Sequence, residues 1–369
     1  MMCLRCAAIL TIVFSLSIAV AEQTRPESIR ADSGLPGAIV MGSGDFNDDG
    51  KLDLLEFGSH GSGVLTLLGK GDGTFRTGRT SPMTQDPNSV AAGDFNHDGK
   101  LDIVTANFAN NVSVMLGNGD GSFQPFVNYP ATPKPQSVAV ADLNGDGNLD
   151  VVVVDHKWKT VNVLLGNGDG TLQASYFFSA GDQPLSLVIA DLNADQTPDL
   201  IVLNDSIARG TADILLGNSD GTFQTPVQYL VGKVPIKAVV GDFNDDSKVD
   251  IAVANLSDLT CILLLGNGDG TFQPQAPIHA WYGPDDMVAG DFNGDQKLDL
   301  VIESTFHIEL FLGNGDSTFQ GDREYIVRSL KGNEAITAGR INQDAKDDVA
   351  VLGVPNDHTF QNIFVLLGR

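Results

Sequence analysis

The hydrophobic positions of this chain occur in short runs and not at helical spacing. Between residues 89 and 129, runs rich in Val, Ile and Leu are separated by Gly, Asn, Asp and Pro. Short apolar runs bounded by turn-forming residues are typical of strands in antiparallel sheets. This stretch therefore predicts four strands, at about Ser89–Gly93, Leu101–Ala106, Val112–Leu116 and Gln124–Tyr129.

The same four-strand pattern recurs with a fixed period. An acidic segment of the type DFNHDGKLDI begins at Asp45, Asp94, Asp142, Asp191, Asp242 and Asp291, and a degraded copy, RINQDAKDDV, begins at Arg340. A second segment, of the type LLGNGDGTF, follows each of the first six acidic segments. Successive units start 48 to 51 residues apart. A period near 50 residues is typical of propellers and solenoids.

These repeats predict an all-β fold, a seven-bladed β-propeller of four-stranded antiparallel blades. An open solenoid is the alternative, but it would need distinct capping repeats at its two ends. The ends favour a closed ring, because RPESIRADSGLPGAIVMG near the N-terminus matches a fourth strand followed by a first strand. Residues 24–31 are predicted to complete the blade that begins near Glu334, which closes the ring and covers a sheet edge.

The first 21 residues predict a secretory signal peptide. Arg5 is followed by an apolar run from Ala7 to Val20 and by the small-residue triplet that ends at Ala21. A membrane anchor is the alternative, but the run is shorter than the ~20 residues that a span needs. We therefore divide the chain into a signal peptide (1–21) and a propeller (22–369). We expect a secreted protein (extracellular, periplasmic or at the cell surface) with no membrane span.

The formal net charge is −25, from 22 basic and 47 acidic residues, and removing Arg5 makes it −26. Nucleic acid and anionic membranes are therefore poor partners for the surface as a whole. The hydrophobic content of 42% is too high for an acidic disordered chain. Cys261 is the one cysteine left after cleavage, so we interpret it as a small buried hydrophobe and expect no internal disulfide. The acidic surplus needs a local explanation.

The acidic segments predict calcium sites. Each has the pattern Asp-x-Asn-x-Asp-x-x-x-Asp, with side-chain oxygens at positions 1, 3, 5 and 9 and a backbone carbonyl expected as the ligand at position 7. A flexible, carboxylate-rich set of oxygens favours calcium over zinc or magnesium. An acidic β-turn is the alternative. The expected ligands are Asp45, Asn47, Asp49, Lys51 and Asp53; Asp94, Asn96, Asp98, Lys100 and Asp102; Asp142, Asn144, Asp146, Asn148 and Asp150; Asp191, Asn193, Asp195, Thr197 and Asp199; Asp242, Asn244, Asp246, Lys248 and Asp250; and Asp291, Asn293, Asp295, Lys297 and Asp299.

The unit DFNxDGxLD…VLLGNGDGTF resembles the FG-GAP/VCBS repeat of integrin α-subunit propellers, some fungal lectins and many exported bacterial proteins. The resemblance covers essentially all of residues 24–369. It implies a seven-bladed propeller with calcium in the loop that joins the first and second strands of a blade.

Some copies depart from this pattern. Position 6 holds Gln196, Ser247 and Gln296 where other copies have Gly, which costs about 1 kcal/mol if a left-handed backbone is needed. The seventh copy has Arg340 at position 1. We predict that this copy binds no calcium, so that up to six ions bind, and that Arg340 pairs with Asp344 or Asp348 in place of the metal.

The GNGDG segments are interpreted as hairpin turns between third and fourth strands, on the same face as the calcium loops. The opposite face carries loops that differ from unit to unit, and it holds Trp158, Trp281 and Tyr282. Exposed aromatic rings on a rigid scaffold suit stacking against sugars or contact with a protein. Packing of each Trp over a neighbouring blade is the alternative.

We therefore interpret the protein as a calcium-stabilised binding or adhesion module for a carbohydrate or protein ligand, and not as an enzyme. The alternative is a propeller-type enzyme that acts on polysaccharide with its chemistry in the central channel. The sequence contains no HExxH motif and no activated-cysteine context, and its six histidines fall in different units. An acid or histidine outside the acidic loops that points into the central channel or the variable-loop face beside a second titratable group would favour the enzyme.

Overall fold

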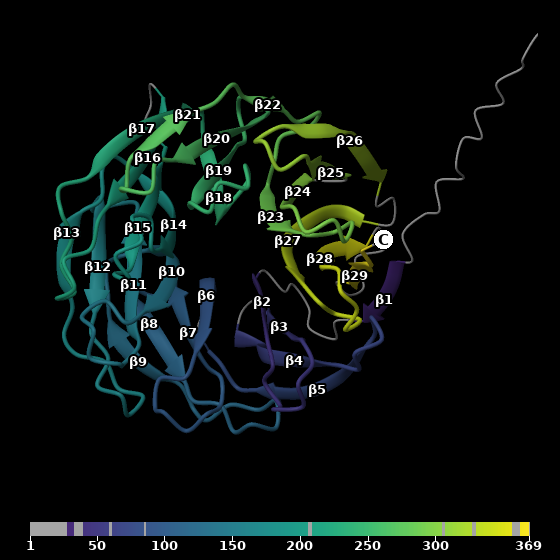
Figure 1. Cartoon of the computed structure of the whole chain (residues 1–369). Coiled ribbons are helices and arrows are strands. Elements are labelled where there is room, and N and C mark those ends of the chain that lie inside the picture. Colours follow the sequence, from purple (N-terminus) through teal and green to yellow (C-terminus); the bar gives the residue numbers. More distant parts are fainter. Residues whose placement is uncertain are drawn as a thin grey trace, which may run out of the picture.

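The computed structural model describes residues 28–32, 40–58, 61–84, 86–205, 209–304, 307–326, 330–355 and 362–368. These residues form seven antiparallel sheets arranged as blades around a central axis (Figure 1). The predicted seven-bladed propeller is confirmed. The predicted signal peptide lies outside the described residues. Within the described ranges, no helix has the length and apolar character to cross a bilayer.

Each blade places its first strand nearest the axis and its fourth strand at the rim (Figure 1). Blades one to three consist of β2 (Val40–Gly44), β3 (Asp53–Gly58), β4 (Gly63–Gly69) and β5 (Phe75–Ser81); β6 (Pro87–Gly93), β7 (Asp102–Asn107), β8 (Asn111–Met115) and β9 (Val127–Pro130); and β10 (Pro135–Ala141), β11 (Asp150–Asp155), β12 (Thr160–Leu164) and β13 (Tyr176–Ser179). Blades four and five consist of β14 (Pro184–Ala190), β15 (Asp199–Asn204), β16 (Gly210–Leu215) and β17 (Val227–Gly232); and β18 (Pro235–Gly241), β19 (Asp250–Asn255), β20 (Thr260–Gly266) and β21 (Phe272–Pro274), with the short β22 (Ile278–His279) also paired to β20. Blades six and seven consist of β23 (Asp286–Gly290), β24 (Asp299–Ser304), β25 (His307–Gly313) and β26 (Phe319–Ile326); and β27 (Leu330–Gly339), β28 (Asp348–Pro355), β29 (Asn362–Leu366) and β1 (Ser28–Asp32).

The first three strands predicted for the second unit agree with β6, β7 and β8 to within two residues. The fourth strand is shorter than predicted, because β9 begins at Val127 and not at Gln124. Residues 124–126 instead continue the turn, where Gln124 N donates a hydrogen bond to Leu116 O (2.8 Å).

The ring closes as the sequence predicts. β1 pairs antiparallel with β29, with Ser28 opposite Leu366 and Asp32 opposite Asn362. Blades seven and one are also joined by side chains, since Gln343 Nε2 donates to Gly50 O (3.3 Å). The N-terminal strand therefore supplies the fourth strand of blade seven.

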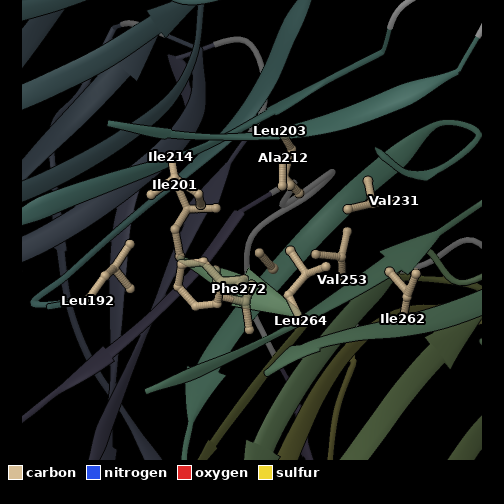
Figure 2. Packing of buried hydrophobic residues seen from close by; sticks show 12 residues of the cluster. Leu192, Ile201, Leu203, Ala212, Ile214, Val231, Val253, Ile262, Leu264 and Phe272 are labelled. Atoms are coloured by element: carbon tan, nitrogen blue, oxygen red, sulfur yellow. The ribbon is translucent and has the colours of Figure 1, made fainter. Parts of the chain in front are cut away.

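The hydrophobic core is divided into layers between neighbouring blades. In the layer between blades four and five, Leu203 and Ile214 pack with Val253 and Leu264, and Phe272 joins the same cluster (Figure 2). Each second strand is covered on both faces, which explains its continuous run of Val, Ile and Leu. These layers fix the positions of the loops at both ends of the blades.

Glu56 is a buried carboxylate in blade one. It lies on β3 and is 0% exposed, and in the part of the chain that the structure describes neither of its carboxylate oxygens has a hydrogen-bond partner. Burial raises the pKa of Glu56 from the ordinary 4.5 to about 8. The folded state therefore holds a proton that the unfolded chain loses, and stability falls as pH rises from about 4.5 to about 8.

Glu56→Gln should remove this pH dependence. We expect the variant and the wild type to melt at similar temperatures near pH 5, and the variant to be more stable near pH 9 by up to about 4 kcal/mol. Thermal melts of both proteins at the two pH values measure the difference, and effects of pH on the acidic loops cancel in this comparison. A difference in melting temperature between the two proteins that does not increase with pH would contradict the raised pKa of Glu56.

Candidate metal loops and ligand-binding face

The six complete acidic loops share one internal hydrogen-bond pattern, seen clearly in blade two. Asp94 Oδ1 accepts from Asp98 N (3.2 Å), Asp94 Oδ2 from Gly99 N (2.9 Å), and Asn96 Oδ1 also from Asp98 N (3.0 Å). Asp98 Oδ1 accepts from Lys100 N (3.0 Å). The oxygens of positions 1, 3 and 5 thus turn toward one short stretch of backbone, which is the curled loop that the pattern predicts.

Position 6 requires a left-handed backbone in every complete loop. Gly99 has φ 81°, while Gln196, Ser247 and Gln296 adopt φ 67°, 63° and 67° without being glycine. A left-handed backbone is therefore needed at position 6, and each of these three non-glycine residues costs about 1 kcal/mol. The backbone N–H of position 6 donates to the position-1 carboxylate, as Gln196 N does to Asp191 Oδ2 (2.8 Å).

The position-9 aspartates have a role that sequence reasoning missed. Asp102 is 0% exposed, and it accepts from Phe95 N (2.9 Å) through Oδ2 and from Gly117 N (2.7 Å) through Oδ1. It therefore joins the start of the acidic loop to the end of the third strand. The equivalent residues make the same two contacts: Asp53, Asp150, Asp199, Asp250, Asp299 and Asp348.

Burial of these aspartates is costly for the charged form. It raises the pKa of Asp53, Asp150 and Asp299 to about 6, despite the two backbone hydrogen bonds that each accepts. The neighbouring carboxylates of the same loop raise it further. The sequence did hold a clue to this structural role, since the seventh copy keeps Asp348 although it has lost the aspartate at position 1.

The chemical types of the oxygen ligands in each loop are those that bind a hard cation. Carboxylate and amide oxygens at positions 1, 3 and 5, with the carbonyl of position 7, are the ligands that calcium prefers. The position-9 oxygens already accept amides, although each keeps a second lone pair. Among the described residues, no group of three or more His, Cys, Asp or Glu side chains is placed to hold a metal by those groups alone. Calcium in these loops therefore stays a prediction.

Position 7 contributes more than a carbonyl in three loops. Lys51, Lys100 and Lys248 place Nζ 3.6, 3.5 and 3.2 Å from the position-5 carboxylate of their own loop. Lys297 instead donates to Asn314 O (2.7 Å), in the third-to-fourth turn of the same blade. These lysines partly neutralise the loop face.

The predicted role of Arg340 is wrong. Its side chain is exposed, and no ion pair joins it to Asp344 or Asp348 within the described residues. Asp348 is instead bonded to Ile341 N (2.9 Å) and Gly368 N (2.8 Å), so its oxygens need no guanidinium partner. The seventh loop also has a positive φ at Gln343 but not at position 6. It is held by the same buried aspartate as the other loops.

The GNGDG segments are hairpin turns, as predicted. Asp120 Oδ1 accepts from both Ser122 N (3.0 Å) and Ser122 Oγ (2.6 Å), and Gly119 and Gly121 have positive φ. Gly121 N also donates to Phe46 O (2.9 Å) in the acidic loop of the preceding blade. These turns therefore connect neighbouring blades on the loop face, a contact that the sequence did not reveal.

On the opposite face, Trp281 and Tyr282 form one exposed group. Trp281 is 71% exposed, and its backbone N–H donates to Glu309 Oε2 (3.0 Å); Tyr282 N donates to Glu309 Oε1 (3.2 Å). Glu309 is itself fully buried on β25. The Tyr282 ring stacks on His307, with centroids 3.7 Å apart and planes 4° apart. A buried carboxylate thus fixes the segment that presents these rings.

Trp158 belongs to a second group, on blade three. It is 55% exposed, and its backbone N–H donates to Asp155 Oδ1 (2.5 Å). Its ring lies 6.5 Å from that of Phe177, which is 50% exposed. The structure brings Trp281 and Tyr282 together and leaves Trp158 on another blade. Neither Trp is covered by a neighbouring blade, so the alternative of simple packing does not hold for their side chains.

The FG-GAP-like repeat family matches five overlapping segments of the chain, at residues 45–105, 94–153, 142–202, 191–253 and 242–302. The chain belongs to the FG-GAP-like repeat family. The matched segments begin at the position-1 aspartates of the first five acidic loops. No curated protein sequence matches this FG-GAP propeller.

Solved structures share the fold at low sequence identity. An Agrocybe aegerita lectin that recognises non-reducing terminal N-acetylglucosamine is 21% identical, with a TM-score of 0.58 over 79% of this chain and 80% of the lectin chain. BBS1N, solved in complex with ARL6DN, is 10% identical, with a TM-score of 0.65 over 94% and 98%. The rhamnogalacturonan lyase YesW is 12% identical, with a TM-score of 0.52 over 93% and 75%. At these identities the likeness shows the fold alone.

Proposed function

We propose that this FG-GAP propeller is a secreted, calcium-stabilised module that binds a carbohydrate or protein ligand on the face opposite the acidic loops. The observation that carries the proposal is Trp281. A large apolar side chain that is 71% exposed is fixed through its backbone by the fully buried Glu309. Rigid, exposed aromatic rings lose little conformational freedom when they contact a ligand.

Trp281→Ala should weaken ligand binding at least about tenfold while leaving the melting temperature unchanged. The side chain is solvent-exposed and the backbone amide that contacts Glu309 remains, so the fold keeps its contacts. A glycan array in calcium, repeated in chelator, identifies the ligand, and titration of the variant with that ligand measures the loss. Asp120→Asn, in a turn on the opposite face, is the control variant. Loss of binding in this control without unfolding would show that the ligand uses the other face.

A polysaccharide-acting enzyme is the second candidate, and one observation bears on it. Lys237 on β18 and Asp286 on β23 lie on the inner strands, with Nζ 3.0 Å from Oδ1. Asp286 also accepts from Met287 N (2.8 Å), so it is held as a structural ion pair. An acid beside a second titratable group on the inner strands is what the enzyme alternative requires. Lys237 and the Met287 amide already occupy Asp286 Oδ1, so we keep binding as the first proposal. Release of new reducing ends from polysaccharides by the wild type, abolished in Asp286→Asn, would support the enzyme instead.

A further inference from the structure

Blade three carries a corner of unusual composition, made of Trp158 and Phe177 with Lys157 and Lys159; we refer to it as the blade-three corner. The two rings are each at least half exposed, with planes inclined at 59°. Phe177 lies on β13, the strand at the rim, and Trp158 lies in the turn between β11 and β12. Two apolar rings therefore meet solvent side by side.

A polar residue occupies the position of Phe177 in the neighbouring blades. In blade two, Ser113 Oγ donates to Asn128 Oδ1 (2.6 Å) across β8 and β9. In blade four, Gln228 Nε2 donates to Asp213 Oδ2 (2.8 Å) across β16 and β17. In these two blades the rim strand satisfies a buried polar side chain of the third strand.

Blade three gives up that hydrogen bond. Asn162 lies opposite Phe177 and is 0% exposed, and neither its amide nitrogen nor its amide oxygen has a hydrogen-bond partner among the described residues. A buried polar atom left unpaired costs about 1–3 kcal/mol. Blade three is therefore less stable than a Gln or Asn at position 177 would make it. A destabilising choice that exposes an aromatic ring beside Trp158 is typical of a binding site.

The lysines of the corner are not required by the turn. Blade five has a turn of the same length, NLSDLT at 255–260, in which Leu259 takes the left-handed conformation (φ 54°) that Lys159 takes in blade three (φ 60°). Ala280 N donates to Leu259 O (3.0 Å), just as Ala180 N donates to Lys159 O (3.0 Å). The blade-five turn reaches this geometry without any lysine.

The charges at the corner favour an anion. Lys159 pairs with Asp182, and both side chains are about half exposed. Lys157 is exposed and has no ion pair within the described residues. Of the two carboxylates nearby, Asp182 is matched by Lys159, and Asp155 is buried and holds Trp158 N. Lys157 is therefore the lysine of the corner whose charge no ion pair within the described residues offsets, and it lies beside the exposed Trp158 in a chain of net charge −25.

We propose that the blade-three corner binds pyranose rings that carry a carboxylate, such as the uronate residues of an acidic polysaccharide. The ring stacks on Trp158 and Phe177, and Lys157 pairs with the carboxylate. Asp155 holds the turn in place before the ligand arrives, which lowers the entropy lost on binding. This inference rests on the proposed function and assigns a ligand class to one site on the same face.

The test uses tetragalacturonate and the matching neutral galactose tetramer as calorimetric probes of the full-length protein in calcium. The wild type should bind the uronate at least about tenfold more tightly at low salt, and added salt should reduce that preference. Lys157→Gln should weaken uronate binding about threefold and leave the neutral tetramer unaffected. Phe177→Gln should weaken binding of both tetramers about threefold or more, yet melt at the same or a higher temperature, because Gln can bond Asn162.

Replacing His-Lys-Trp-Lys at 156–159 with Leu-Ser-Asp-Leu, the sequence of the equivalent blade-five turn, should abolish uronate binding. Asp120→Asn, in an exposed turn on the acidic-loop face, is the control and should leave uronate binding unchanged. The inference is overturned if the wild type binds no uronate, or binds the two tetramers with equal affinity. It is also overturned if the turn replacement keeps wild-type affinity for the uronate, or if the wild type binds an oligothymidylate as tightly as the uronate. If only Trp281→Ala loses binding of the ligand found on the array, the proposed function stands and the blade-three corner is not the ligand site. If none of these variants loses binding of the ligand found on the array, the proposed function itself is wrong.

Discussion

Replacing Asp102 with Ala should lower the free energy of unfolding by about 3–5 kcal/mol, both with calcium and in chelator. The carboxylate is fully buried and accepts from Phe95 N (2.9 Å) and Gly117 N (2.7 Å). Alanine leaves both buried amides without an acceptor and opens a space between the loop and the third strand. Denaturant titration of the variant and the wild type in each condition measures the loss.

Asp98→Ala is the matched control within the same loop. Asp98 is exposed and accepts from Lys100 N (3.0 Å), and that hydrogen bond lowers its pKa. Its replacement should cost little in chelator and show its effect only in calcium. If Asp102→Ala also loses its effect in chelator, position 9 acts through the metal and not through the two amides.

Removal of calcium should lower the melting temperature of the wild type by at least about 5 °C. Each complete loop gathers three carboxylates, and the described part of the chain contains no disulfide to replace the metal, since Cys261 is free and buried. A single site at a hundredfold excess over its dissociation constant stabilises the fold by about 2.7 kcal/mol, so several sites together have a large effect. Melting curves in calcium and in excess chelator measure the shift, and identical curves would refute a structural role for calcium.

The number of calcium ions counted by native mass spectrometry distinguishes the loops that bind calcium from the seventh loop. We expect at most six ions, because the seventh copy has Arg340 at position 1. Arg340 is exposed and makes no ion pair to Asp344 or Asp348 in the described residues, so Arg340→Asp can restore the missing carboxylate without breaking such a contact. This variant should bind one more ion than the wild type. Seven ions in the wild type would show that the arginine is tolerated beside the metal.

The sequence by itself determined the fold because the repeats encode it locally. The period of 48 to 51 residues sets the number of blades, and alternating apolar runs and turn formers set the strands. The match of the N-terminal segment to a fourth strand was enough to predict the closure of β1 on β29. Position 6 could be identified as left-handed because Gly stands there in some copies, and Gln196 confirms it with φ 67°.

The roles of several side chains depend on contacts between segments far apart in the chain, and these roles became visible only in the folded molecule. The ligand pattern hid the structural role of Asp102, because its amide partner Gly117 lies beyond the end of the following strand, β8. Arg340 was misjudged because charge complementarity with Asp348 ignored the backbone amides of Ile341 and Gly368, which already donate to that carboxylate. Phe177 did not stand out in the sequence, since a strand residue shows its cost only when the partner across the ladder, Asn162, is seen unpaired. Local periodicity is enough to predict a repeat fold. Whether a buried polar group finds a hydrogen-bond partner depends on how the strands and blades pack together.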